Sequence, residues 1–412
     1  MSSVTATVTL QEFRRRAIAW LASRLEPRRT ETSTWGVGPE SVAVFHDLGL
    51  DEARRLDAEL RKWHVAKLDA GWAGITWPVE FGGLGLDPEY DRVFHEEQSR
   101  FVTPVEHEAF NVTLELVAPV IQMYGTDEQK QRFLPMFLRV EQLACQLFSE
   151  PEAGSDLASL RCRAQRTGDT WVIDGQKVWT SGAQLADYGL LIARSDPAAP
   201  QHRGMTAFMV PLDAPGVEIR PIRQMTGGAS FNEVFLNGVC LGDDMRLGAE
   251  GDGWKVALST LGFERSSSAG GAGGAGGSWS QVLTLVRHLG ADHHPIVRQS
   301  VAALYTMFRI EELSNERAAA VLRAGQQPGP LGSVGKLFWT QRLAHTSDLV
   351  SRVLGPHLVA DTGEWGTYAW GEHVLGAPGY RIAGGSDEIQ RNIIGERVLG
   401  LPREPRPKEN NA

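Results

Sequence analysis

The spacing of hydrophobic residues changes twice along this chain, and that change constrains the fold more than any other feature. In the first third, apolar residues recur at helical spacing, as at Leu56, Leu60 and Trp63. Short runs of β-branched and aromatic residues follow, and Asp174-Gly175 stands between two of them as a two-residue hairpin signal. Helical spacing then returns. The sequence therefore predicts a helical region, a β-rich region and a second helical region, in that order.

Length and composition place these regions in an ordinary globular protein. A chain of 412 residues exceeds one small core, and its length suggests two or three domains. From the changes of pattern along the chain we expect domains at 1–143, 144–247 and 248–412 in an α+β multidomain fold. Hydrophobic residues make up 42% and charged residues 22% of the chain, as in typical globular proteins. A net charge of −9 without a Lys/Arg-rich block argues against nucleic acid as the main partner.

Location follows from cysteine usage and from the apolar runs. The three cysteines, Cys145, Cys162 and Cys240, are scattered, which suits neither a disulfide framework nor a zinc site. The N-terminal residues lack the apolar stretch of a secretory signal. Apolar runs stay below the ~18 residues that a membrane-spanning helix needs. We therefore expect a protein of the reducing cytoplasm with no membrane segment and no resident metal.

Four segments carry a family resemblance: "FSEPEAGSDLASL", "KVWTSGAQLADYGLLIARSD", "MTGGASFNEVFLNGV" and "GGSDEIQRNIIGERVLG". In this order they resemble the acyl-CoA dehydrogenase family, over roughly residues 10 to 402. The resemblance implies an N-terminal helical domain, a central β-barrel-like domain and a C-terminal four-helix bundle, with FAD held between the last two. It also implies oxidation of an acyl-CoA thioester to the 2-enoyl-CoA. A carboxylate removes the α-proton while the β-hydrogen leaves as hydride to the flavin.

The β-region motifs supply what a flavin needs, namely an aromatic wall and hydrogen-bond donors. Phe148 and Ser149 match family positions at the edge of the flavin ring, and Ser155 matches one near the pyrophosphate. Trp179 matches the aromatic that stacks on the ring, and Ser181 matches a donor to it. An isolated tryptophan in such a run would be interpreted as a strand core residue, but the surrounding motif favours the cofactor.

The glycine turn near the C-terminus also matches the family. Gly384 and Gly385 let backbone approach a ligand closely, and Ser386 or Asp387 can cap the helix that follows. A helix N-terminus suits a negatively polarised ligand group. The resemblance implies cofactor contacts from Gly384, Gly385, Ser386 and Glu388. Taken alone, the segment would be a plain helix-starting turn.

The turn lacks the expected catalytic base, because the family commonly carries glutamate where this chain has Gly384. Isovaleryl-CoA and some long-chain acyl-CoA dehydrogenases place the glutamate on the first long helix of the bundle, which matches Glu264 here. Positions one turn away on that helix are not basic, so we expect a desolvated carboxylate of raised pKa, suited to a general base. Arg265 is expected to position that base or complement its charge. Gly384→Ala should then spare the chemistry.

Other departures from the family's motifs leave open whether the chain assembles with copies of itself or with a different chain. Family motifs that contact a neighbouring subunit's FAD have their nearest matches at Arg287 and Arg352, but the aromatic and the double glycine are absent. A homotetramer or dimer is expected, with a heterotetramer as the alternative. In that alternative the chain completes another subunit's flavin site. An oxidase or monooxygenase on the same fold is a third reading. The resemblance implies electron transfer flavoprotein as the electron acceptor.

The segment from Ser266 to Ser278 reads "SSSAGGAGGAGGS". It either continues the helix that carries Glu264 or breaks it, because each interior glycine costs up to ~1 kcal/mol relative to alanine. If the helix continues, the wall of the acyl pocket behind Glu264 has no bulky side chains. The chain should then prefer branched, cyclic or otherwise bulky acyl groups over short straight ones.

Overall fold

The computed structural model describes residues 8–28, 41–45, 48–105, 107–269, 275–323, 329–360 and 367–403. The chain divides into two compact units. One comprises Met1–Ser33 and His46–Leu261, and the other comprises Thr34–Phe45 and Gly262–Ala412. Within the described ranges, no helix combines the length and apolar character needed to cross a bilayer.

Amphipathic helices open the first unit. They are α1 (Leu10–Ala22), α2 (Leu50–Asp69), α3 (Pro88–Gln98), α4 (Glu108–Asn111), α5 (Ala118–Tyr124) and α6 (Asp127–Leu138), with a π-helical segment, Val112–Val117, between α4 and α5. Helix α1 buries Phe13, Ala17 and Leu21, which recur every four residues along one face. This face packs into an apolar cluster with Trp72 and Phe94.

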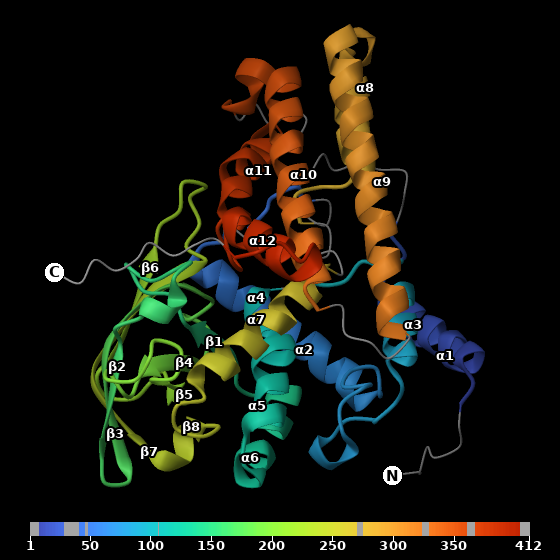
Figure 1. Ribbon diagram of the computed structural model, residues 1–412. Helices are drawn as coiled ribbons and strands as arrows, with labels where there is room; N and C mark the ends of the chain where they lie inside the picture. The colour runs from blue at the N-terminus through green and yellow to red at the C-terminus, as the bar shows by residue number, and fades with distance from the viewer. Residues whose placement is uncertain are drawn as a thin grey trace, which may run out of the picture. The chain divides into compact units, whose positions relative to one another are not determined.

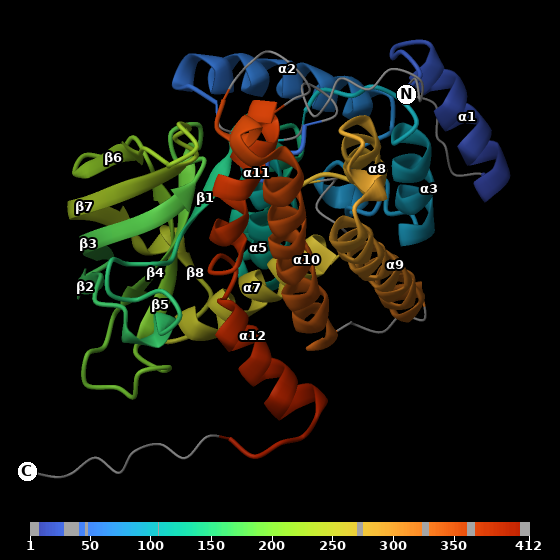
Figure 2. The same ribbon diagram turned by 90° about the horizontal axis from the view of Figure 1, so that it is seen from above.

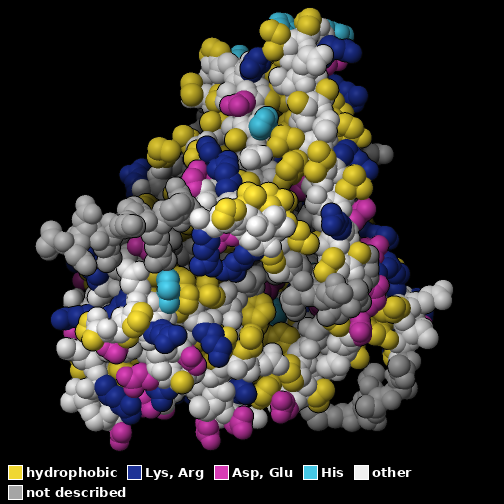
Figure 3. All heavy atoms as spheres, viewed as in Figure 1, with side chains coloured by type: hydrophobic (Ala, Val, Ile, Leu, Met, Phe, Trp, Pro, Cys, Tyr) yellow, Lys and Arg dark blue, Asp and Glu magenta, His cyan; other side chains and the backbone are white. Residues whose placement is uncertain are grey.

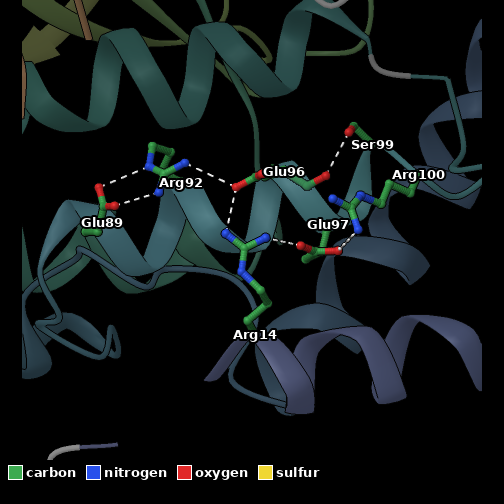
Figure 4. A network of polar contacts seen from close by, with 7 residues as sticks. All are labelled: Arg14, Glu89, Arg92, Glu96, Glu97, Ser99 and Arg100. Carbon is green, nitrogen blue, oxygen red and sulfur yellow. Dashed lines mark hydrogen bonds and ion pairs between the residues drawn. The ribbon is translucent and has the colours of Figure 1, made fainter. Parts of the chain in front are cut away.

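An ion-pair network joins α1 to α3 (Figure 4). Arg14 donates to Glu96 over 2.8 Å and to the neighbouring Glu97. Glu97 is 1% exposed and also pairs with Arg100 over 3.0 Å. Exposed pairs contribute little, but removing the partner of a buried carboxylate is strongly destabilising. Arg14 therefore anchors α1 mainly through Glu97.

The β region of the first unit is one mixed sheet in the order β6-β7-β3-β2-β4-β5-β8, with β1 added in parallel to β4. The strands are β1 (Ala144–Leu147), β2 (Arg163–Thr167), β3 (Thr170–Ser181), β4 (Tyr188–Arg194), β5 (Met205–Pro211), β6 (Val217–Ile222), β7 (Phe231–Gly242) and β8 (Arg246–Leu247). Figure 2 shows β6, β7 and β3 lying side by side. The expected β-rich region is confirmed.

The hairpin predicted at Asp174-Gly175 is wrong. Strand β3 runs through both residues, and its pairing with β7 shifts register between Ile173 and Gly175. A Cβ on Gly175 would lie 2.7 Å from the Cα of Cys162, so glycine is required there by a close backbone approach. The turn between β2 and β3 instead uses Gly168, whose φ of +64° favours glycine.

Helices return with α7 (Gly253–Ala269), which runs from the first unit into the second. The second unit continues with α8 (Trp279–His288), α9 (Pro295–Arg323), α10 (Leu331–Leu354), α11 (Thr367–Tyr380) and α12 (Asp387–Ile393). Figures 1 and 2 show α10 between α9 and α11, and α10 contacts both. Its Leu349, Val350 and Leu354 pack with Leu285 of α8 and Trp370 of α11.

The glycine-rich segment breaks the helix. Helix α7 ends at Ala269, and α8 begins after Ser278, whose side chain forms a capping box with Gln281. Gly276 and Gly277 both have φ of +83°, which is not helical. Residues 270–274 lie outside the described part of the chain. The alternative of one continuous helix is therefore wrong.

Candidate active site

In the first unit, Trp179 is held in an uncommon backbone conformation. The pairing of β3 with β7 shifts register between Lys177 and Thr180, and Trp179 has a φ of +60°. Non-glycine residues in this region are uncommon and gather at functional sites. The Trp179 side chain is 59% exposed, and its ring meets that of Phe231 edge-on at 6.1 Å. A strand core residue would be buried, so the exposed face is available to a planar group.

A buried ion pair joins the two β-region motifs. Lys177 is 0% exposed, and its Nζ donates to Glu150 Oε1 over 2.8 Å and to the Phe148 carbonyl over 2.9 Å. The Glu150 carboxylate also accepts the backbone N–H groups of Arg161 and Cys162. The segment that carries Phe148 is thereby fixed against β3. Sequence reasoning quoted both motifs but missed this pair, although a charged residue in each motif was a signal.

The serines of the predicted flavin set are available as donors. Ser149 and Ser181 are half-buried and Ser155 is exposed, while Phe148 is buried. Within the described residues, none of the three hydroxyls is hydrogen-bonded. Together with the open face of Trp179, this donor set fits the polar edge and ring of a flavin.

In the second unit, the predicted helix cap is present. Ser386 accepts the N–H of Ile389 at the start of α12, after Gly384 and Gly385 with φ of +62° and +90°. Asp387 does not cap: it is buried and accepts the hydroxyl of Thr340 over 2.8 Å and Nε of Arg381 over 3.0 Å. Glu388 is exposed and pairs with Arg391. Gln390 donates to the carbonyls of both glycines.

Lys336 of α10 lies beneath the same turn, and sequence reasoning missed it. It is 4% exposed, donates to the Gly385 carbonyl over 2.9 Å and lies 3.8 Å from Asp387 Oδ1. Burial lowers the pKa of Lys336, while the charges of Asp387, Glu264 and Glu388 oppose that shift. Glu264 therefore has a cation in its surroundings, contributed by a helix other than its own.

Glu264 lies beside Gly384. A Cβ on Gly384 would be 2.8 Å from Glu264 Oε1 and 3.6 Å from its carboxyl carbon. Glu264 is half-buried on α7. The side chain of Arg265 lies outside the described residues. The structure therefore brings Glu264 to the very turn where the sequence lacks a carboxylate.

The comparisons with known proteins identify the family. Sequence models for the acyl-CoA dehydrogenase N-terminal, middle and C-terminal domains match residues 7–141, 145–239 and 251–399. The chain belongs to the acyl-CoA dehydrogenase family, and the expected fold is confirmed. It is therefore an FAD-dependent flavoprotein oxidoreductase of lipid metabolism.

Individual relatives agree. Acyl-CoA dehydrogenase IpdE1 of Mycobacterium tuberculosis is 38% identical over 96% of this chain and 98% of its own length. Acyl-CoA dehydrogenase FadE29 of the same organism is 33% identical over 92% and 93%. Among solved structures, the Tcur3481-Tcur3483 steroid ACAD has a TM-score of 0.75 at 27% identity, covering 98% of this chain and 100% of its own. The ChsE4-ChsE5 complex from Mycobacterium tuberculosis has a TM-score of 0.72 at 27% identity, with the same coverage.

Proposed function

We propose that the chain oxidises an acyl-CoA thioester to the 2-enoyl-CoA and that Glu264 removes the α-proton. The observation that carries this proposal is the fit between Glu264 and Gly384: the carboxylate lies where a side chain at position 384 would be. A base at Gly384 is chemically impossible, and Asp387 is engaged with Thr340 and Arg381. Glu388 is exposed and pairs with Arg391, whereas the carboxylate of Glu264 reaches Gly384 itself.

The polar network beneath the turn supports that role. Lys336 and Gln390 both donate to the Gly385 carbonyl, which restrains the backbone against which Glu264 lies. The positive charge of Lys336 favours the ionised carboxylate, the form that accepts a proton. The sequence-based expectation was a lone, desolvated carboxylate. The proposal replaces it with a carboxylate balanced between partial burial and a nearby cation.

The flavin site of this proposal lies in the first unit. Trp179 would face the ring, Ser149 and Ser181 would bond its polar edge, and Ser155 would approach the pyrophosphate. When bound, FAD supplies a two-electron acceptor for the hydride that leaves the β-carbon. From the second unit, Gly384, Gly385, Ser386 and Glu388 stay proposed as cofactor contacts on the family resemblance. Trp179→Ala should lose bound FAD, measured by absorbance of the purified protein.

For the substrate, we propose a bulky acyl group. The support comes from relatives, because a solved structure at 27% identity is a steroid ACAD. The glycine-rich segment gives this proposal less support than the sequence suggested, because the helix behind Glu264 does not continue through it. A panel of thioesters from butanoyl-CoA to ring-bearing acyl-CoA, followed by flavin bleaching, tests the proposal. The highest kcat/KM on butanoyl-CoA would contradict it.

For the assembly, we propose pairing with a second, related chain, with electron transfer flavoprotein as acceptor and the cytoplasm as location. Two solved structures, Tcur3481-Tcur3483 and ChsE4-ChsE5, are named for two components each. Helix α9 exposes Ile296, Ile310 and Leu313, and Figure 3 shows apolar side chains on the surface of the C-terminal helices. Light scattering with flavin quantification tests this. A homotetramer with one FAD per chain would exclude the heteromer.

The decisive experiment replaces the base. Glu264→Gln keeps size and polarity but removes the basic carboxylate. Because general-base catalysis contributes typically about 10²–10⁴-fold, anaerobic flavin reduction in stopped flow should slow by at least about two orders of magnitude. FAD content and thioester binding should be retained. Near-normal reduction would place the base elsewhere, and rapid reoxidation of the reduced wild type by oxygen would favour the oxidase alternative.

A further inference from the structure

A short strap of residues 41–45 packs into the second unit, although it comes between α1 and α2 in the sequence. Its apolar side chains, Val42, Val44 and Phe45, are at most 7% exposed. The strap is neither helix nor strand, so contacts with residues far away in the sequence hold it in place. Those contacts show what the strap in turn holds.

The start of the strap is anchored on the helices of the second unit. Val42 packs in the apolar cluster with Leu285 of α8 and Trp370 of α11. The Val42 carbonyl lies 3.1 Å from Nδ1 of His373, which is also buried on α11. None of these three partners belongs to the turn of Gly384. Val42 therefore fixes the strap without contacting that turn through them.

The end of the strap packs on the last turn of α11. The Phe45 ring stacks on the ring of Tyr380, with the centroids 4.7 Å apart and 13° between the planes. Tyr380 also contacts the ring of Trp339 on α10, at 4.6 Å. Gly379 leaves room for Phe45, because a Cβ at Gly379 would lie 2.6 Å from Phe45 Cε2. Phe45 is thereby fitted closely to the end of α11.

The turn beside Glu264 is built on the same end of α11. The Gly379 carbonyl accepts the N–H groups of Ile382 over 3.2 Å and of Ala383 over 3.0 Å. Ala383 directly precedes Gly384, against which the Glu264 carboxylate lies. A shift of Gly379 is therefore passed by two hydrogen bonds to the backbone beside Glu264.

We propose that Phe45 is a positioning residue for removal of the α-proton, and that it acts on the Gly384 turn through Tyr380 and Gly379. Close-packed interiors relax only in part around a lost side chain, so removal of the Phe45 ring shifts its neighbours. A misplacement of about 1 Å can cost on the order of 10²-fold in rate. This role rests on the proposed function, in which Glu264 is the base.

The first test is anaerobic stopped-flow reduction of Phe45→Leu, which removes the ring and keeps an apolar side chain. The substrate is the thioester of the panel above that bleaches the wild-type flavin fastest. The rate at saturating thioester should fall by at least about tenfold, because the turn moves. The thioester concentration at half-maximal rate should stay within about twofold, as expected when an interaction of the transition state is lost.

Val42→Ala is the matched control. Val42 belongs to the same strap and is 0% exposed, so its truncation should lower the melting temperature, as Phe45→Leu does. It should keep the reduction rate, because the partners of Val42 lie outside the turn. Equal slowing in both variants would mean that any loosening of the strap slows the reaction, and it would overturn the proposal.

Gly379→Ala perturbs the same contact from the opposite side. Gly379 lies in α11, where alanine is favoured over glycine, but the added Cβ would displace the Phe45 ring. This variant should slow flavin reduction in the wild-type background and much less in Phe45→Leu, where the ring is gone. Additive effects of the two substitutions would show that they act independently, contrary to the proposal.

Hydrogen exchange distinguishes failure of this proposal from failure of the proposed function. The N–H of Ala383 should exchange faster in Phe45→Leu than in the wild type or in Val42→Ala, measured by mass spectrometry of peptides that contain the turn. Unchanged exchange in Phe45→Leu would refute the role of Phe45. If no thioester bleaches the flavin, or if Glu264→Gln is reduced normally, the proposed function fails, while exchange still decides whether Phe45 holds the turn.

Discussion

Gly384→Ala is the sharpest test of the arrangement at the turn. The added Cβ would lie 2.8 Å from Glu264 Oε1, closer than such contacts allow, and the φ of +62° is unfavourable for alanine. Placing alanine in this left-handed conformation costs roughly 1–2 kcal/mol of stability. The close contact also forces the Glu264 carboxylate or the turn to shift. From the sequence alone this change was expected to spare the chemistry, but the contact with Glu264 reverses that expectation.

The expected loss of rate follows from the displacement of the Glu264 carboxylate. A misplacement of about 1 Å can cost on the order of 10²-fold in rate, so flavin reduction should slow by about that factor. Unfolding free energy should fall by only about 1–2 kcal/mol. Stopped-flow reduction under anaerobic conditions measures the first quantity and denaturant titration the second.

Gly290→Ala is the matched control. Its φ of +62° is the same as that of Gly384, and its Cβ would meet nothing within 4 Å. It should share the loss of stability and keep the reduction rate. Equal slowing in both variants would mean that backbone strain, not displacement of Glu264, sets the rate. Normal reduction in Gly384→Ala would refute the placement of the base.

Three further predictions concern charge. Lys336→Met removes the cation that favours ionised Glu264, so the pH at which flavin reduction is half-maximal should rise. Lys336→Arg keeps the charge and should return that pH to the wild-type value. If the pH profile does not move in Lys336→Met, Lys336 has a structural role alone. Glu150→Ala leaves the buried Lys177 without its charged partner and should lower the free energy of unfolding in denaturant titrations by about 3–5 kcal/mol. Burial lowers the pKa of His64 and of His373 from 6.5 to about 4. Below about pH 6.5 these histidines bind protons in the unfolded chain but stay neutral in the folded chain. The free energy of unfolding should therefore fall by roughly 3 kcal/mol per histidine between pH 6.5 and 4. A free energy of unfolding that does not change with pH over that range would contradict this.

The sequence by itself determined the order of the helical and β regions, because hydrophobic periodicity is a local property that burial on one face imposes. It also determined the family, through long motifs in a fixed order. Glu264 could be singled out because the family resemblance places the base on that helix, and the sequence shows that its neighbours one turn away are not basic. The helix cap at Ser386 was accessible because capping depends on residues close together in the sequence.

Tertiary structure decided whatever depends on residues far apart in the chain. Asp174-Gly175 carries a strong local turn signal, yet the approach of the Cys162 backbone makes it an irregularity inside β3. The cation near Glu264 comes from α10, which no inspection of α7 alone can find. The buried Oε1 of Gln98 has no hydrogen-bond partner among the described residues, and packing by residues distant in sequence decides which polar atoms remain so.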